Sequence, residues 1–148
     1  MMKLAIRIDT RDEKLYVAIA YGLCAISLLN LLPGLPPIIT FLVPIGQFFV
    51  FRMTKTHFAK FGTAQALIIG ILLLLCDFAL WRFIPTGIYD SERPLAPIFR
   101  SSILLWIFNL LYTVVCMWIG NRALKGRTTN LSIITRIAIG LAQGIDVQ

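Results

Sequence analysis

Charged side chains are scarce in this sequence: Asp, Glu, Lys and Arg together make up 14% of the 148 residues. Soluble domains usually carry about 25%. Apolar residues account for 58% of the chain, and the mean hydropathy is +0.82. Because so little polar surface cannot cover a globule in water, we predict that a lipid bilayer surrounds the protein. The length fits a single domain.

The residues that carry most enzyme and metal chemistry are also few. His57 is the only histidine, and an interfacial histidine of this kind is typically solvated or packed. Cys24, Cys76 and Cys116 lie in apolar runs without C-x-x-C spacing, which is typical of small buried apolar residues. The sequence contains no H-E-x-x-H, G-x-S-x-G, P-loop or glycine-rich nucleotide turn. We therefore predict no catalytic, cofactor-binding or metal-binding residues, and no enzyme activity.

The formal net charge of +7 could indicate nucleic acid binding in a soluble protein. Here the basic residues flank apolar runs, which indicates contact with the anionic cytoplasmic leaflet of a membrane. We expect the lipid bilayer, and not nucleic acid, to be the partner.

Apolar runs divide the chain into three parts. Residues 1–14 form a short, mixed-charge cytoplasmic segment, residues 15–121 a membrane domain, and residues 122–148 a basic turn followed by an apolar tail. Within the membrane domain we predict four spans, at about residues 15–32, 38–53, 62–83 and 98–120. The predicted fold class is an all-α integral membrane bundle of four transmembrane helices with a C-terminal interfacial amphipathic helix.

Two of these segments allow more than one interpretation. The run 38–53 is short and contains Pro44 and Gly46, so it could be a kinked span or a re-entrant hairpin. We favour the span. The tail 128–148 is too short and interrupted for a fifth span. Its apolar residues share one helical face, which predicts a helix lying in the interface. They are Leu131, Ile134, Ala138, Leu141 and Ile145.

The distribution of Lys and Arg predicts the orientation. Residues 1–14 carry four, the connection between the second and third spans three, and the segment after the fourth span four. The opposite side carries three, at Arg82, Arg93 and Arg100. Eleven against three places both termini in the cytoplasm.

Strongly polar residues are rare inside the predicted spans. From the helical rise of about 1.5 Å per residue, Gln47, Asp77 and Asn109 are expected in one layer. An unpaired carboxylate there costs about 2.5 kcal/mol or more. We therefore expect Asp77 to face the bundle and to meet Asn109, Gln47, Tyr112 or a hydroxyl. This intramembrane polar layer is either a tie between helices, which we favour, or a constriction in a transport path.

Small residues recur at helical spacing at the start of the third span. Gly62, Ala66 and Gly70 form a ladder that predicts a helix-packing face. Gln65 beside this ladder is interpreted as a polar residue at a helix start that reaches headgroups or loop backbone.

The stretch HFAKFGTAQALIIG resembles a recurring element of the chloroplast inner-envelope translocon component of the Tic-twenty type and its small bacterial relatives. Phe58, Lys60, Phe61, Gln65 and Ala66 occupy the motif positions. The sequence departs from the pattern at Gly62, where the family tends to have His or Asn, and at Thr63, where it tends to have Ala. The proline-interrupted second span and the basic turn 123–127 also agree with the pattern of this family.

The resemblance implies a four-helix membrane protein, with protein import as the role of plastid members. On this basis we expect a small non-enzymatic subunit, structural or accessory, or a component of an oligomeric pore. It would form a homo-oligomer or join a larger membrane complex, in the inner membrane of a bacterium. The alternative is a channel or transporter whose path is lined by Asp77, Asn109 and Gln47.

Overall fold

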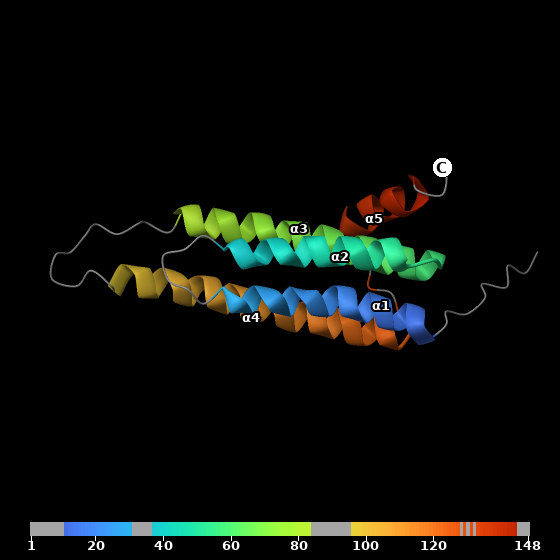
Figure 1. Ribbon diagram of the computed structural model, residues 1–148, viewed down its shortest axis with the longest axis horizontal. Helices are drawn as coiled ribbons and strands as arrows, with labels where there is room; N and C mark the ends of the chain where they lie inside the picture. The colour runs from blue at the N-terminus through green and yellow to red at the C-terminus, as the bar shows by residue number, and fades with distance from the viewer. Residues whose placement is uncertain are drawn as a thin grey trace, which may run out of the picture.

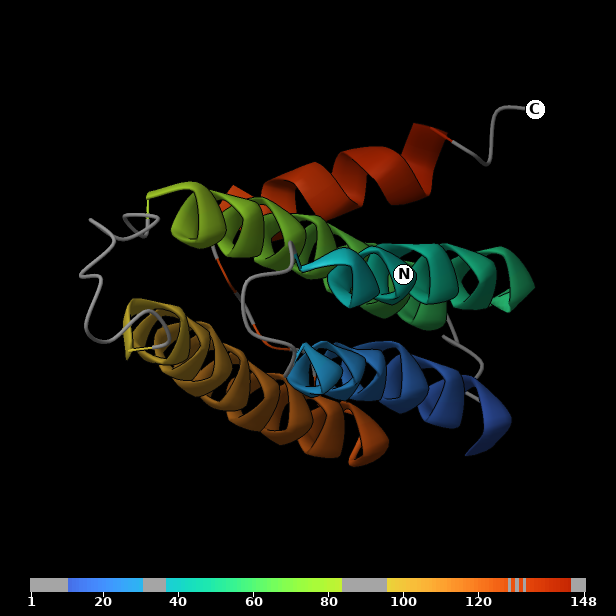
Figure 2. The same cartoon turned by 60° about the vertical axis from the view of Figure 1, so that its left-hand side comes forward.

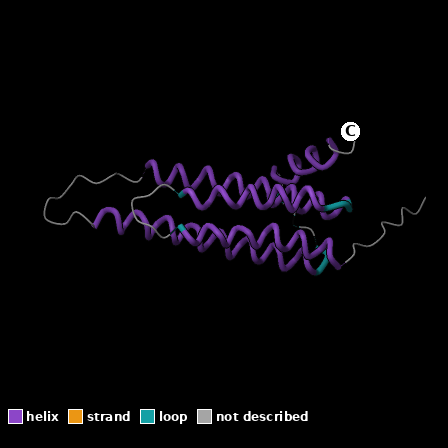
Figure 3. Tube along the Cα trace, in the orientation of Figure 1, coloured by secondary structure: helices purple, strands orange, loops and turns teal. Residues whose placement is uncertain are grey.

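The computed structural model describes residues 11–30, 37–83, 96–127, 129, 131 and 133–144, with the backbone alone at 82–83, 96–103 and 143–144. All regular structure in these residues is helical (Figure 3). The predicted all-α class is therefore confirmed. The elements are α1 (Arg11–Gly22), η1 (Leu23–Leu29), η2 (Ile38–Phe41), α2 (Leu42–Met53), α3 (His57–Phe83), α4 (Ala96–Leu124) and α5 (Ile133–Gly144).

Four of the helical segments lie side by side in two layers. The helices α2 and α3 form one layer, and α1 and α4 form the other (Figures 1 and 2). Successive helices run in opposite directions. The core between the layers is built from buried side chains of α1, α3 and α4, with Val43 from α2. This up-down-up-down arrangement is one of the known topologies of four-helix bundles.

The first two segments tighten into 3₁₀ geometry where they approach each other. α1 begins at Arg11 with Asp12 and Glu13 in its first turn, where acidic residues favour a helix start. It continues as η1 to Leu29, three residues short of the predicted end of that run. The second segment, Ile38–Met53, is one uninterrupted helical pass and not a hairpin. Pro44 lies three residues after η2 passes into α2, so the change from 3₁₀ to α geometry falls beside the residue that has no N–H to donate.

Two helices, His57–Trp81 and Leu104–Leu124, are long and apolar enough by themselves to cross a membrane. The third helix starts five residues before the predicted residue 62. Thr56 is the reason, because its hydroxyl accepts a hydrogen bond from the Ala59 backbone N–H at 3.2 Å and caps the first turn. The motif residues thus all lie inside α3.

The packing of α2 against α3 repeats every seven residues. Thr54 contacts Thr63 through their hydroxyls at 3.4 Å, Gln47 lies against Gly70, and Thr40 donates to Asp77 at 2.6 Å. A seven-residue repeat keeps one seam between two helices in register, as in coiled coils. This seam fixes which residues of the second and third segments share a level.

The C-terminal helix packs along α3 instead of lying apart at the end of the bundle (Figure 2). Ala138 is buried against Phe51 and Ala64, whereas Leu141, one turn later, is exposed. Ile145 lies outside the described residues. The backbone of Thr129, in the linker before this helix, is bound to α3, as described below.

The three basic segments meet at one end of the bundle. Glu13 in α1 accepts hydrogen bonds from the Lys55 backbone N–H at 3.3 Å and from the Thr56 hydroxyl at 3.3 Å. Lys14 Nζ lies 3.2 Å from where a Cβ on Gly126 would stand, just after α4. The start of α1, the α2–α3 turn and the end of α4 are therefore neighbours.

Candidate functional site: polar clusters inside the bundle

Asp77 is fully buried and is the centre of a hydrogen-bond cluster that joins all four segments of the bundle. Its Oδ1 accepts from Asn109 Nδ2 of α4 at 2.8 Å, and its Oδ2 accepts from the Thr40 hydroxyl of η2 at 2.6 Å. Asn30, which ends η1, donates its Nδ2 to the Thr40 hydroxyl. Both carboxylate oxygens are thus satisfied, which a carboxylate removed from water requires.

Asn109 is held in one orientation by two acceptors. Its Nδ2 donates to Asp77 and also to the Leu105 carbonyl, at 2.9 Å, one turn earlier in α4. Its Oδ1 is buried and accepts no hydrogen bond. The amide therefore serves as a donor that fixes α4 to α3 at this level.

Gln47 does not belong to this cluster, which corrects the predicted single layer. Its Nε2 donates to the Ala20 carbonyl at 2.9 Å and to Cys24 Sγ at 3.6 Å, and its Oε1 is buried without a partner. It lies at the level of Gly70, seven residues before Asp77, or about 10 Å along the helix. The depth estimate failed because it counted each span from its end and ignored the register between α2 and α3.

Thr40 and Asn30 are the members of the Asp77 cluster that sequence reasoning missed. A signal for Thr40 exists in the sequence. Thr40, Gln47 and Thr54 are spaced by seven residues, and so are Thr63, Gly70 and Asp77. Pairing the two series in opposite directions brings Thr40 to Asp77. No comparable signal points to Asn30, because its position depends on the turn between the first two segments.

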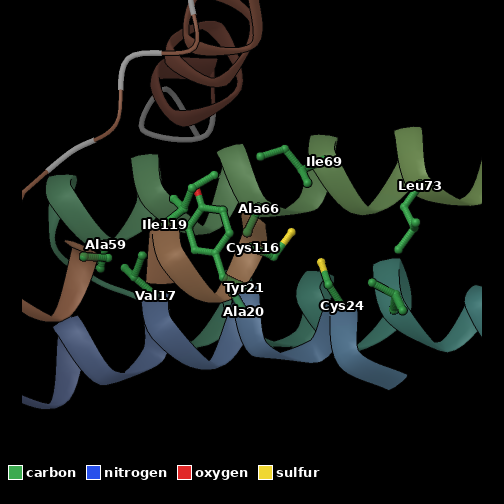
Figure 4. Packing of buried hydrophobic residues seen from close by; sticks show 12 residues of the cluster. Val17, Ala20, Tyr21, Cys24, Ala59, Ala66, Ile69, Leu73, Cys116 and Ile119 are labelled. Carbon is green, nitrogen blue, oxygen red and sulfur yellow. The ribbon is translucent and has the colours of Figure 1, made fainter. Parts of the chain in front are cut away.

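A second buried cluster surrounds Gln65, near the basic end. Its Oε1 accepts from the Tyr21 hydroxyl of α1 at 3.0 Å, and its Nε2 donates to the Thr129 carbonyl at 3.0 Å. Tyr21 lies within the apolar core with its hydroxyl toward α3 (Figure 4). The predicted contact of Gln65 with loop backbone is present, and Thr129 in the linker between α4 and α5 is consequently tied to α3.

The remaining motif residues lie around this second cluster. Phe58 and Phe61 are partly buried and line a small cavity beside Gln65, and Ala66 is fully buried in the core. Lys60 is partly exposed on the first turn of α3. These residues therefore pack the first turns of α3 against α1 and the linker.

The small-residue ladder forms close contacts with two different helices. A Cβ on Gly62 would lie 2.6 Å from Val17 Cγ1 of α1, and a Cβ on Gly70 would lie 1.9 Å from Gln47 Oε1 of α2. Ala66 lies between them in the core. At these two positions only glycine leaves room for the facing side chain.

The described residues contain no group of three or more His, Cys, Asp or Glu side chains that could hold a metal ion. Chemically, the two clusters offer hydrogen-bond donors and acceptors between helices. Asp77, Asn109 and Gln47 have no exposed surface. This arrangement favours a role in holding helices together.

Comparison with family models, curated proteins and solved structures gave no match for this chain. The resemblance to the translocon component therefore stays a hypothesis that depends on the motif residues.

Proposed function

We propose that this chain is a multi-pass membrane protein with four spans and both termini on the cytoplasmic side. Support comes from the distribution of polarity, since polar residues such as Asp77 and Gln47 face inward while large apolar side chains face outward. The outward side chains on α2, α3 and α4 include Phe48, Phe49, Leu72, Leu75, Leu111 and Val115. An apolar exterior around a partly polar interior is suited to lipid and unsuited to water.

Within the membrane we propose a non-catalytic role as a structural or accessory subunit, or as one subunit of an oligomeric pore, as the family resemblance implies. The observation that carries this proposal is the Asp77 cluster. Both carboxylate oxygens accept hydrogen bonds from neighbouring segments, so this fully buried acid ties helices together. Interhelical hydrogen bonds of this kind are worth about 0.6 kcal/mol each, which suits a packing role.

A transport path through a single bundle is the weaker proposal. Asp77 and Gln47 are both fully buried, and they lie at levels about 10 Å apart. Electrical recordings on the purified, reconstituted protein test this alternative directly. We expect no conductance from the wild type or from Asp77→Asn. A conductance that changes with the Asp77→Asn substitution would favour the channel instead.

The orientation is tested by tagging both termini and labelling intact cells with a reagent that cannot cross the membrane. We expect both tags to be protected until the membrane is permeabilised. Labelling of one terminus in intact cells would overturn the four-span proposal.

The subunit role is tested by the size of the protein in mild detergent, extracted from its own membrane and, in parallel, purified alone. We expect the extracted protein to migrate in an assembly larger than one 16.6-kDa chain. A monomer in both preparations would contradict the subunit proposal while leaving the orientation intact.

A further inference from the structure

The outward face of α5 is almost entirely apolar, although this tail was predicted to lie in the membrane interface. Its small residues Ala138 and Ala142 are buried, whereas its large side chains are exposed. The exposed ones are Ile133, Ile137, Ile139 and Leu141, with exposed fractions from 39% to 74%. Arg136 is the single charged residue of the helix. A helix at an aqueous surface directs polar residues toward the water, and α5 directs apolar ones outward.

The chain reaches α5 through a linker that starts at the basic end of the bundle, where α4 ends. Gly126, with a φ of +72°, donates its N–H to the Ala123 carbonyl at 2.8 Å and ends α4 in a Schellman turn. The Thr129 carbonyl then accepts from Gln65 of α3 at 3.0 Å, and Leu131 packs against the main core. From there α5 runs along α3 back toward the basic end (Figures 1 and 2). The linker and α5 therefore enter and leave the bundle at the same end.

Aromatic residues at the other end of α3 indicate how deep this segment lies. Trp81 packs edge to face against Phe78, with 6.3 Å between the ring centres. Tryptophan is enriched at membrane interfaces, and a hydrocarbon core of about 30 Å takes about 20 helical residues. Counting back from Trp81 places the cytoplasmic edge of that core near Phe61. Gln65, which binds the linker, and Ile68, which packs at α5, then lie about 6–10 Å inside the edge.

The register of α4 gives the same edge. Hydrogen bonds from Asn109 and Tyr112 fix α4 against α3, and counting onward from them brings Arg122 to about the level of Phe61. The Arg122 guanidinium carbon lies 5.1 Å from the centre of the Trp118 ring. A cation beside a tryptophan is typical of a membrane interface.

The exposed face of α5 also continues an apolar surface of its neighbours. Ala138 packs against Phe51 of α2, and Ile68 of α3 packs at the same cluster. One turn deeper on each of these helices, Phe48 and Leu72 are 48% and 40% exposed. The proposed function assigns both of these side chains to lipid, so α5 lies at the border of a lipid-covered surface.

We propose that the linker and α5 form a re-entrant membrane element, and that acyl chains of the cytoplasmic leaflet cover the outward face of α5. The proposal rests on the proposed function, which places this end of the bundle at that leaflet. Gln65 then supplies the hydrogen bond that lipid cannot give to the Thr129 carbonyl. Ile137 and Ile139 point about 160° apart around the helix. Acyl chains cover both sides at once, whereas a single protein partner would cover one.

The experiment measures the depth of α5 in a bilayer with nitroxide labels on introduced cysteines. Cys76→Ala removes the exposed native thiol, and Cys24 and Cys116 are buried. In this background, Ile137→Cys and Ile139→Cys are labelled separately and reconstituted in vesicles of phosphatidylethanolamine and phosphatidylglycerol. Paramagnetic resonance then compares collisions with oxygen, which concentrates in lipid, and with a water-soluble nickel chelate. We expect both labels to meet oxygen more often than nickel.

Two further positions calibrate the measurement. A label at Leu72→Cys, on the exposed apolar face of α3, should behave as the two α5 labels do. A label at Lys55→Cys, exposed in the basic turn between α2 and α3, should show the reverse ratio, with more nickel collisions than oxygen collisions. The Cys76→Ala protein without an introduced cysteine should take up no label. Circular dichroism of each variant verifies that the helices are retained.

Two results would overturn the assignment to acyl chains. Nickel collisions at residue 137 or 139 as frequent as at residue 55 would place α5 at the aqueous surface. Few collisions with either reagent, together with spin–spin broadening, would mean that a second copy of the chain covers α5. In both cases an oxygen-rich label at residue 72 leaves the four spans intact. A nickel-rich label at residue 72 would instead contradict the four-span proposal, so the two proposals fail separately.

Discussion

Gly70 offers the most direct test of how α2 packs against α3. A Cβ at this position would lie 1.9 Å from Oε1 and 2.8 Å from Cδ of Gln47. Gln47 cannot move aside freely, because it is fully buried and its Nε2 donates to the Ala20 carbonyl at 2.9 Å. Gly70→Ala must therefore either displace the Gln47 amide and break that bond, or push the two helices apart.

Three effects determine how much Gly70→Ala changes the free energy of unfolding. Alanine in place of glycine within a helix adds up to about 1 kcal/mol of stability. Overpacking of a close contact costs about 1–3 kcal/mol, and a lost interhelical hydrogen bond costs about 0.6 kcal/mol. We expect Gly70→Ala to lower the free energy of unfolding by about 1–2 kcal/mol.

A second substitution should reverse this effect. Gln47→Ala removes the side chain that the new methyl group would meet. In that background, Gly70→Ala should be neutral or should stabilise by up to about 1 kcal/mol, which gives a coupling energy of at least about 1 kcal/mol between the two sites. Gly140→Ala is the control, because a Cβ at residue 140 has no neighbour within 4 Å. It should be neutral or stabilising.

The assay is unfolding of the purified protein in mixed micelles with increasing sodium dodecyl sulfate, followed by the near-ultraviolet circular dichroism of its tryptophans. The packing argument is wrong if Gly70→Ala is as stable as Gly140→Ala. It is equally wrong if the destabilisation persists when Gln47 is alanine.

Three further predictions concern the other buried contacts. Asp77→Asn should keep most of the stability, because the amide oxygen still accepts a hydrogen bond, whereas Asp77→Leu strands two buried donors and should cost about 1–3 kcal/mol in the same assay. Equal stability of these two variants would contradict the tie between helices. Gln65→Ala frees the Thr129 carbonyl, so trypsin should cleave the α4–α5 linker faster than in the wild type; an unchanged rate would count against the anchoring of the linker. Gly62→Ala should destabilise by about 1–2 kcal/mol through its contact with Val17. Adding Val17→Ala should relieve the destabilisation caused by Gly62→Ala. If Val17→Ala restores no stability to the Gly62→Ala variant, the strain lies elsewhere.

Much of the helical organisation could be predicted from local sequence signals. Apolar runs and flanking breakers located the helices to within about five residues. The Lys and Arg distribution put the start of α1, the α2–α3 turn and the end of α4 on one side, and the structure has these three as neighbours. The start of α3 was missed because the cap at Thr56 is a single hydroxyl within a basic stretch, whereas the apolar signal begins only later. Local hydropathy does not detect such a cap.

The polar contacts were less predictable. The pairing of Asp77 with Asn109 follows from counting residues along two antiparallel spans, and the structure has this hydrogen bond. To predict that Gln47 lies at a different level from Asp77, one must know the register between α2 and α3. To predict the contact of Asn30, one must know the turn before η2. Both depend on how helices slide past one another, which no single helix specifies.

The sequence by itself determined that this chain is helical. It also determined that the long helices have too few polar side chains to make their outward faces polar. Composition and the period of the helix suffice for that, because they act within one segment at a time. Only the tertiary structure decided that Asp77 is tied to Thr40, that Gly70 makes room for Gln47, and that Gln65 holds the linker inside the bundle. These contacts join residues from different segments. Which residues meet depends on how far each helix is shifted along its axis relative to its neighbours.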